Sequence, residues 1–129
     1  RLGERRLPLS WDACCGRYVN HWATHPAPDA ASLMRSRYSA FVRERADYLL
    51  ATWWAPNRPA SLDFDAGAKW LGLDVRDHRT LSADRAEVEF VSLLRVAGRA
   101  VRLHERSRFE RHADEQGVQR WWYVDGDQF

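Results

Sequence analysis

Apolar residues recur at two different periods along this chain, and each period predicts one kind of secondary structure. After Asp29, which can cap a helix, apolar positions recur about every 3.6 residues as far as Trp53. One helix is therefore predicted, ending by Ala55-Pro56. From Leu73 onward the period is two, as expected for strands that bury one face. The apolar positions of the predicted helix are Leu33, Met34, Tyr38, Phe41, Val42, Leu49 and Trp53.

Two of the predicted strands form a hairpin around Ala97-Gly98, a pair suited to a two-residue turn. This turn sets the register, because it places Glu89 opposite Arg106 and Glu87 opposite Arg108. Two pairs of opposite charges then share one face, and each contributes a few tenths to about 1 kcal/mol. A slip by one residue would put these charges among the apolar set, so the charge pattern supports the register.

The remaining segments complete the prediction of an α+β domain. Residues 1–28 have no apolar period, and Leu62 to Leu71 form a candidate short helix with acidic residues in its first turn. A last strand is predicted from about Gln119 to Val124, after a loop that contains Gly117. The apolar face of the antiparallel sheet needs a cover, and the helix that follows Asp29 is amphipathic and long enough to provide it.

Composition narrows the class of protein. The chain has 129 residues, enough for one domain with a sizeable core, and its 7 Trp are amphipathic residues that line cores, pockets or interfaces. A net charge of +2 argues against a dedicated duplex-DNA binder. The basic residues are nearly all Arg, which reflects either a GC-rich coding sequence, the favoured explanation, or recognition of anions. Without an apolar stretch of roughly 20 residues or a signal peptide, a cytoplasmic protein without a membrane partner is expected.

Glu105 is the most conspicuous candidate for a site. The predicted register places it opposite Phe90 on the apolar face, where a carboxylate is costly unless it is paired or hydrogen-bonded. It could be a general base or a ligand anchor. The favoured alternative is a structural ion pair with Arg35 or Arg37, or a bond from a Trp N–H. These two arginines lie on nearly opposite sides of the predicted helix, so at most one faces the sheet.

We expect one of these arginines to form a fork with Glu105, as the polar anchor of an apolar cavity bounded by Phe41, Phe90, Leu94 and a Trp of the last strand. Asp47 is a second carboxylate that could act in such a cavity. The predicted catalytic candidates are therefore Glu105 and Asp47. The predicted binding residues are Arg35, Arg37, Tyr38, Trp53, Phe90, Glu105 and Trp122.

An Arg-rich strand face offers a different kind of site. Arg102, His104, Arg106 and Arg108 alternate along one predicted strand and could contact phosphates, with Trp121 or Trp122 stacking on a base. Two of these arginines already have cross-strand glutamates, however. A solvated charged face is therefore the favoured interpretation, and nucleic acid is not an expected partner.

Several blocks of sequence occur together in one known family. They are SLMRSRYSAFV (32–42), DYL (47–49), WLGL (70–73), VEFV (88–91), ERSRF (105–109) and WYVDG (122–126). In these blocks the chain resembles the YchJ-like family of bacterial proteins of unknown function. The resemblance implies a nuclear-transport-factor-2-like (NTF2-like), or cystatin-like, fold over residues 29–129. In that fold, helices pack on the concave side of a curved antiparallel sheet.

The same family carries a SEC-C motif, a short zinc site near the N-terminus. Cys14-Cys15 matches the second half of that motif, so residues 1–28 resemble a degenerate SEC-C segment. The first half has no counterpart, and zinc normally takes four N or S ligands. We therefore expect no zinc and no other cofactor, unless His21 or His25 completes the site. The first three residues are what codons for Cys-Gly-Ser-Gly give when read out of frame, which suggests a frameshift or a misassigned start.

The sequence therefore predicts a non-catalytic binding or adaptor domain with an apolar cavity, which takes an unknown small ligand or protein partner and could form a homodimer through its sheet. Two alternatives remain open. Related folds include isomerases and dehydratases, so the resemblance also allows a small-molecule enzyme of the isomerase or hydrolase type with a pocket carboxylate. The Arg-rich strand face would allow contact with RNA or the ribosome.

Overall fold

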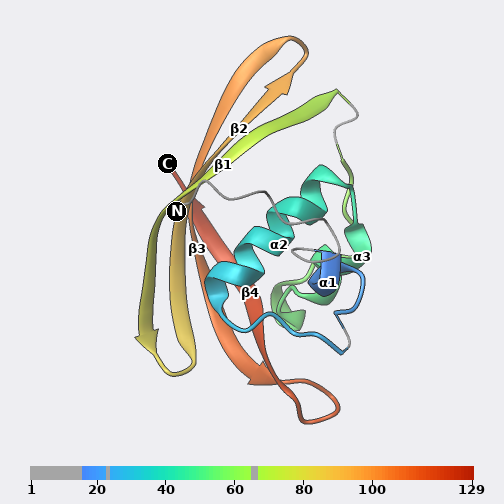
Figure 1. Ribbon diagram of the computed structural model, residues 1–129, viewed down its shortest axis with the longest axis vertical. Coiled ribbons are helices and arrows are strands. Elements are labelled where there is room, and N and C mark those ends of the chain that lie inside the picture. Colours follow the sequence, from blue (N-terminus) through green and yellow to red (C-terminus); the bar gives the residue numbers. More distant parts are fainter. Residues whose placement is uncertain (1–15, 23, 65–66) are drawn as a thin grey trace.

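A computed structural model describes residues 16–22, 24–64 and 67–129 of the chain. The described helices and strands follow one another as four helical segments and then four strands (Figure 1). The helical segments are α1 (Gly16–Val19), α2 (Ala30–Val42), α3 (Ala46–Ala51) and the 3-10 helix η1 (Ala55–Asn57). The strands are β1 (Ala68–Ser82), β2 (Arg85–Val96), β3 (Arg99–Ala113) and β4 (Gln119–Gln128).

The four strands form one antiparallel sheet in the order β1-β2-β3-β4, so every strand pairs with its neighbour in sequence. The sheet curves, and α2 lies across its concave side (Figure 1). Buried apolar side chains from both layers meet there, among them Leu33 of α2, Leu49 of α3, Val88 of β2 and Phe109 of β3. The predicted α+β plan, with helices covering one face of an antiparallel sheet, is confirmed.

The predicted β2–β3 register is also confirmed. Glu89 lies opposite Arg106, and Phe90 lies opposite Glu105. The turn between the strands has Ala97 and Gly98 with φ values of 52° and 79°. Two successive positive φ angles define the turn type whose twist matches that of the flanking strands, which explains why a two-residue connection suffices.

The single helix predicted to run as far as Trp53 is wrong, because the chain forms two helices there. Asp29 caps α2 as expected, accepting a hydrogen bond of 2.7 Å from the backbone N–H of Ser32. The helix ends at Val42, and Glu44 has a φ of 55° that reverses the chain before α3. The spacing of apolar residues does not reveal this break, because apolar residues continue at helical intervals on both sides of it.

The short helix predicted from Leu62 to Leu71 is also wrong. Residues 62–64 have no regular structure, residues 65 and 66 lie outside the described part, and strand β1 begins at Ala68. The strand was hidden in the sequence because its register with β2 shifts between Trp70 and Gly72. Such a bulge interrupts the period of two that identifies a strand.

The β2–β3 turn generates a test of stability. Ala97 has a positive φ, which an L-residue with a Cβ adopts at a cost, whereas Asn tolerates it and Asn-Gly is the preferred pair for this turn. We expect Ala97→Asn to raise the free energy of unfolding by about 0.5–1 kcal/mol, measured by urea denaturation with an unchanged m-value. Ala100→Asn, in the adjoining strand, is the control and should give no gain. An equal effect of both substitutions would contradict the assignment of the turn.

Candidate functional site

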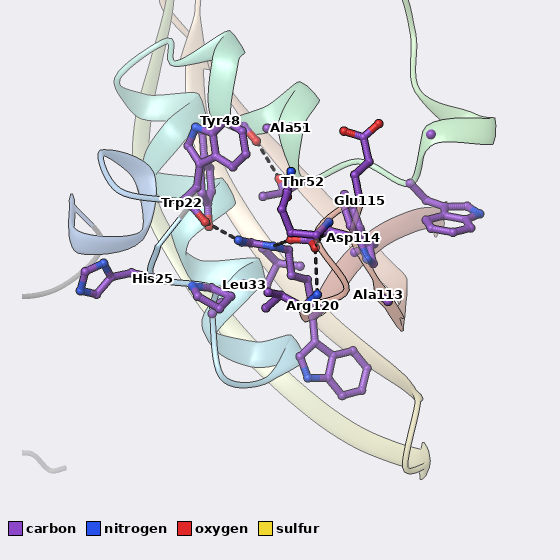
Figure 2. A pocket seen from close by; sticks show the side chains of 18 of the residues that line it. Trp22, His25, Leu33, Tyr48, Ala51, Thr52, Ala113, Asp114, Glu115 and Arg120 are labelled. Carbon is purple, nitrogen blue, oxygen red and sulfur yellow. Dashed lines mark hydrogen bonds and ion pairs between the residues drawn. The ribbon is translucent and has the colours of Figure 1, made fainter.

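An open hollow of about 970 Å³ lies beside the end of the β3–β4 hairpin (Figure 2). The loop before α2, the end of α3, the start of η1 and the turn between β3 and β4 surround it. Its walls are mostly apolar and rich in aromatic rings. The aromatic lining residues are Trp22, Tyr48, Trp54, Trp121 and Trp122. The acidic and arginine residues of the lining are Arg58, Asp114, Glu115 and Arg120, and His25 also lines the hollow.

The hollow exists because the chain meets β4 over a short distance only. Trp53 forms a parallel bridge with Tyr123. The N–H of Trp54 donates to the Tyr123 carbonyl at 2.8 Å, and the N–H of Tyr123 donates to the Thr52 carbonyl at 2.9 Å. Immediately upstream the chain is the helix α3, which ends at Ala51. A helix cannot continue the ladder, so the edge of β4 before Tyr123 is left facing an open space.

Two indoles in the wall are held in place by their own contacts. The ring of Trp54 stacks on His112, with centroids 4.2 Å apart and planes 24° apart. Trp122 meets Trp54 edge to face at 5.8 Å, and its Nε1–H donates to the His112 carbonyl at 3.0 Å. Aromatic surfaces fixed in this way lose little freedom when a ligand contacts them.

The buried charges of the hollow neutralise each other. Asp114 and Arg120 form an ion pair of 2.5 Å (Figure 2), and their side chains are only 11% and 13% exposed. The other Asp114 oxygen accepts the backbone N–H groups of Gln116 and Val118, both at 2.9 Å. The Arg120 guanidinium, together with these N–H groups, holds the pKa of the Asp114 carboxyl below its usual range. Asp114 therefore orders the β3–β4 turn and is not a free acid.

Of Arg35 and Arg37, the two candidate partners of Glu105, Arg37 is the buried one. It is 5% exposed, and its Nη1 donates to the Leu49 carbonyl at 2.8 Å and to the Thr52 hydroxyl at 2.7 Å. Its guanidinium carbon lies 4.5 Å from the centroid of the Tyr123 ring and 5.2 Å from that of Trp53. Burial lowers the pKa of Arg37 to about 10, so the group still carries its charge at neutral pH.

The predicted fork between this arginine and Glu105 does not form. Glu105 instead accepts a hydrogen bond from the Ser107 hydroxyl at 2.5 Å, with the Tyr123 hydroxyl at 3.5 Å and the Gln128 amide at 3.4 Å. Tyr123 thus lies between the two charges. Its burial, with Glu105 nearby, raises the pKa of Tyr123 to about 12. Hydroxyls and an amide, and not an arginine, satisfy this carboxylate.

The predicted site residues do not converge on one place. Trp122 lines the hollow, while Trp53 packs on Tyr123 with ring centroids 5.1 Å apart. Tyr38 lies in a separate depression of about 310 Å³ with Trp70, Phe90 packs against the core, and Arg35 is exposed on α2.

The hollow beside β4 is not the cavity that the sequence predicted, because none of Phe41, Phe90 and Leu94 lines it. Phe41 packs on the rings of Phe64 and Trp70, with centroids 6.3 and 5.9 Å apart. Leu94 is buried opposite Val101.

Asp47 is an exposed surface residue and lies outside the hollow. It forms an ion pair of 3.0 Å with Arg45, whose hydrogen bonds lower the pKa of the Asp47 carboxyl. A carboxyl held ionised at the surface by an arginine is poorly suited to act as a general acid. Its contacts are those of a residue that closes the connection between α2 and α3.

On the Arg-rich strand face, carboxylates bind His104, Arg106 and Arg108. Arg106 binds both Glu87, at 3.2 Å, and Glu89, while Arg108 binds Asp125 at 2.5 Å and Asp127 at 2.8 Å. The predicted charge pairing is thus confirmed for Arg106 with Glu89. Arg108 turns away from Glu87 to β4, a strand that the hairpin register did not include.

Sequence reasoning missed most of the hollow. Trp54, Trp121 and Trp122 were a usable signal, because amphipathic indoles gathered on two segments are typical of residues that line a pocket or an interface. The turn residues 113–118 gave none. Within residues 16–22, 24–64 and 67–129 no group of three or more His, Cys, Asp or Glu side chains is arranged to hold a metal. Cys14 and Cys15 lie outside those ranges, so the expectation of no zinc stays a prediction.

No helix of the described part is long and apolar enough to cross a membrane.

Comparisons with known proteins place this fold. A family model described as the YchJ middle NTF2-like domain matches residues 29–126. A UPF0225 protein of Polaromonas naphthalenivorans (strain CJ2) is 68% identical over 122 residues, which cover 95% of this chain and 85% of that protein. A UPF0225 protein of Bordetella pertussis (strain Tohama I) is 50% identical over 121 residues, which cover 93% of this chain and 87% of that protein. The crystal structure of a SEC-C motif containing protein from Psychrobacter arcticus superposes with a TM-score of 0.81 at 29% identity. The match covers 96% of this chain and 75% of that protein chain.

The environment of Glu105 can be tested with a double-mutant cycle. A Cβ added at Gly126 would lie 2.5 Å from Glu105 Oε2, and the three heavy atoms nearest to it all belong to that side chain. We expect Gly126→Ala to lower the free energy of unfolding by about 1–2 kcal/mol, because the carboxylate must leave its hydrogen-bond partners. In a Glu105→Ala background the same change should be neutral or slightly stabilising. An equal loss in both backgrounds, measured by chemical denaturation, would contradict this packing.

Proposed function

Since this chain belongs to the family of UPF0225 proteins with a YchJ middle NTF2-like domain, we propose that it is a non-catalytic binding domain whose hollow receives an uncharged apolar group of a ligand or partner. The observation that carries the proposal is the aromatic lining that Trp54, Trp121 and Trp122 contribute to an open space of about 970 Å³. Ligand sites in proteins are mostly apolar clefts of roughly 300–1,000 Å³.

The charges around the hollow favour binding over catalysis. An acid–base catalyst needs a titratable group that is free to exchange a proton near the substrate. Asp114 is engaged by Arg120 and by two backbone N–H groups. Glu105, the best sequence candidate for a base, is not among the lining residues and is packed over Gly126. An enzyme of the isomerase or dehydratase type is therefore the weaker proposal.

Contact with RNA through β3 is also weaker. Arg106 is bound to three carboxylates and Arg108 to two, so a phosphate would have to displace existing ion pairs at both positions. Binding to nucleic acid draws its free energy largely from counterion release around uncompensated basic groups. A face on which basic and acidic side chains are already paired offers little of that energy.

Filling the hollow tests the proposal. N-phenyl-1-naphthylamine, an uncharged aromatic dye, should bind the chain saturably with an increase in fluorescence. Ala113 lines the hollow at the end of β3, and Ala100 is exposed at the start of the same strand. Ala113→Trp should weaken dye binding by about tenfold, because the new ring occupies apolar contact surface worth about 1.4 kcal/mol. Ala100→Trp is the matched control and should leave the affinity unchanged.

Two outcomes would count against the hollow as a binding site. Dye binding that does not saturate would mean nonspecific adsorption to exposed apolar residues. Equal affinities for wild type, Ala113→Trp and Ala100→Trp would place the dye elsewhere on the molecule. Thermal denaturation of both variants, monitored by circular dichroism, checks that neither has lost its fold.

A further inference from the structure

We propose that the occupant of the hollow is an extended peptide segment, uncharged and rich in β-branched and aromatic side chains, which adds to the free edge of β4 as a further strand. This inference rests on the proposed function, because it names the partner of the same site. It is carried by the backbone hydrogen-bonding groups of β4.

The direction of the backbone groups along β4 follows from one observed bridge. The N–H and carbonyl of Tyr123 both point away from β3, because they bond to Thr52 and Trp54. In an antiparallel ladder the residues alternate between bonding to the neighbouring strand and pointing away from it. From Tyr123 back to Gln119 the pairing with β3 is regular, without a register shift. The N–H and carbonyl groups of Trp121 and Gln119 therefore also point outward.

These outward groups have no hydrogen-bond partner among the described residues. Trp121 lines the hollow, so its unpaired N–H and carbonyl face the space beside β4. A row of unpaired backbone donors and acceptors is a template for another strand. The Trp53–Tyr123 bridge demonstrates that this edge accepts an extended segment, and the hollow is where such a segment would continue.

The opposite edge of the sheet is built differently. Strand β1 has three register shifts along its length, and exposed ion pairs join Asp74 to Arg76 and Asp77 to Arg79. Bulges and charged side chains on an edge strand oppose pairing with another chain. The described β4 edge between Gln119 and Tyr123 has no bulge. The contrast favours β4 as the edge that is kept available.

The side chains of the hollow indicate which peptide fits. Trp121 and Trp122 are successive strand residues, so their indoles project to opposite faces of the sheet. The side chains of an added strand also alternate between the two faces, so those on one face would lie beside Trp121 and those on the other beside Trp122. The ion pair between Asp114 and Arg120 leaves no buried charge that requires a counter-charge from the ligand. Uncharged residues with a preference for extended backbone meet both conditions.

The test uses a pool of N-acetylated, C-amidated hexapeptides in which Thr alternates with Val, Ile, Phe or Trp. Peptides that remain with the full chain on size-exclusion chromatography are identified by mass spectrometry, and the affinity of the strongest is measured by calorimetry. Two analogues are then made, N-methylated at odd or at even positions. Strand addition predicts that one analogue binds about tenfold or more weakly and that the other keeps its affinity, because only alternate N–H groups face β4.

A backbone substitution in the chain gives a second readout. Gln119→Pro removes an outward N–H and no bond to β3, whereas Gln119→Ala keeps that N–H. We expect the proline variant to bind the peptide several-fold more weakly than the alanine variant, with equal dye binding by both. Equal peptide affinities of the two variants, or equal affinities of the two N-methylated analogues, would overturn strand addition.

The outcomes separate the two proposals. Saturable dye binding without any retained peptide would overturn the inference and leave the proposed function standing. Loss of both would overturn both. Concentration-dependent dimerisation of the chain that Gln119→Pro abolishes and the dye does not affect would overturn the peptide as occupant in favour of a second copy, detected by sedimentation velocity.

Discussion

The burial of one charged group, the guanidinium of Arg37, organises the junction between the helices and the sheet. Within the described part of the chain no carboxylate forms an ion pair with it, so a carbonyl, a hydroxyl and two aromatic faces must offset its lost hydration. The carbonyl of Leu49 belongs to α3 and the hydroxyl of Thr52 follows directly after it. Satisfying the arginine therefore fixes where α3 ends and where the chain turns toward Tyr123.

That position decides what can exist beside β4. The break at Glu44 lets α3 turn back so that the Tyr48 hydroxyl meets Ser36 at 2.6 Å inside the core. The chain then reaches the sheet at Thr52 and bonds to Tyr123 through two backbone hydrogen bonds. Arg37 bonds to the helical end of α3, whereas Tyr123 of β4 bonds to an extended segment that follows directly. The chain therefore changes from helix to extended backbone within a few residues. The hollow is the space left by this change.

The sequence sufficed for features that depend on neighbouring residues and failed for those that depend on distant ones. The β2–β3 register followed from one turn and from the alternation of charge, both local signals. The pairing of Arg108 with Asp125 and Asp127 required the register of β3 with β4, which a shift between Arg108 and Phe109 alters. A helical wheel correctly placed Arg35 and Arg37 on different sides of the helix. It does not give the distance of a side chain from the sheet, so it did not predict that Tyr123 lies between Arg37 and Glu105. The position of the hollow depended on all of these together.

The order of the strands has a consequence for how the molecule is assembled in time. Each strand pairs with the next in sequence, so the meander consists of short-range hairpins that close quickly. The bond from the Asn57 amide to the Val124 carbonyl spans 67 positions, and such closures carry the larger entropic cost. The contacts of residues 52–57 with β4 are thus expected to be the last to form and the first to open. A molecule that bridges both sides of that seam would slow its opening, so occupancy would be recorded as slower amide hydrogen exchange along β4, far beyond the atoms it touches.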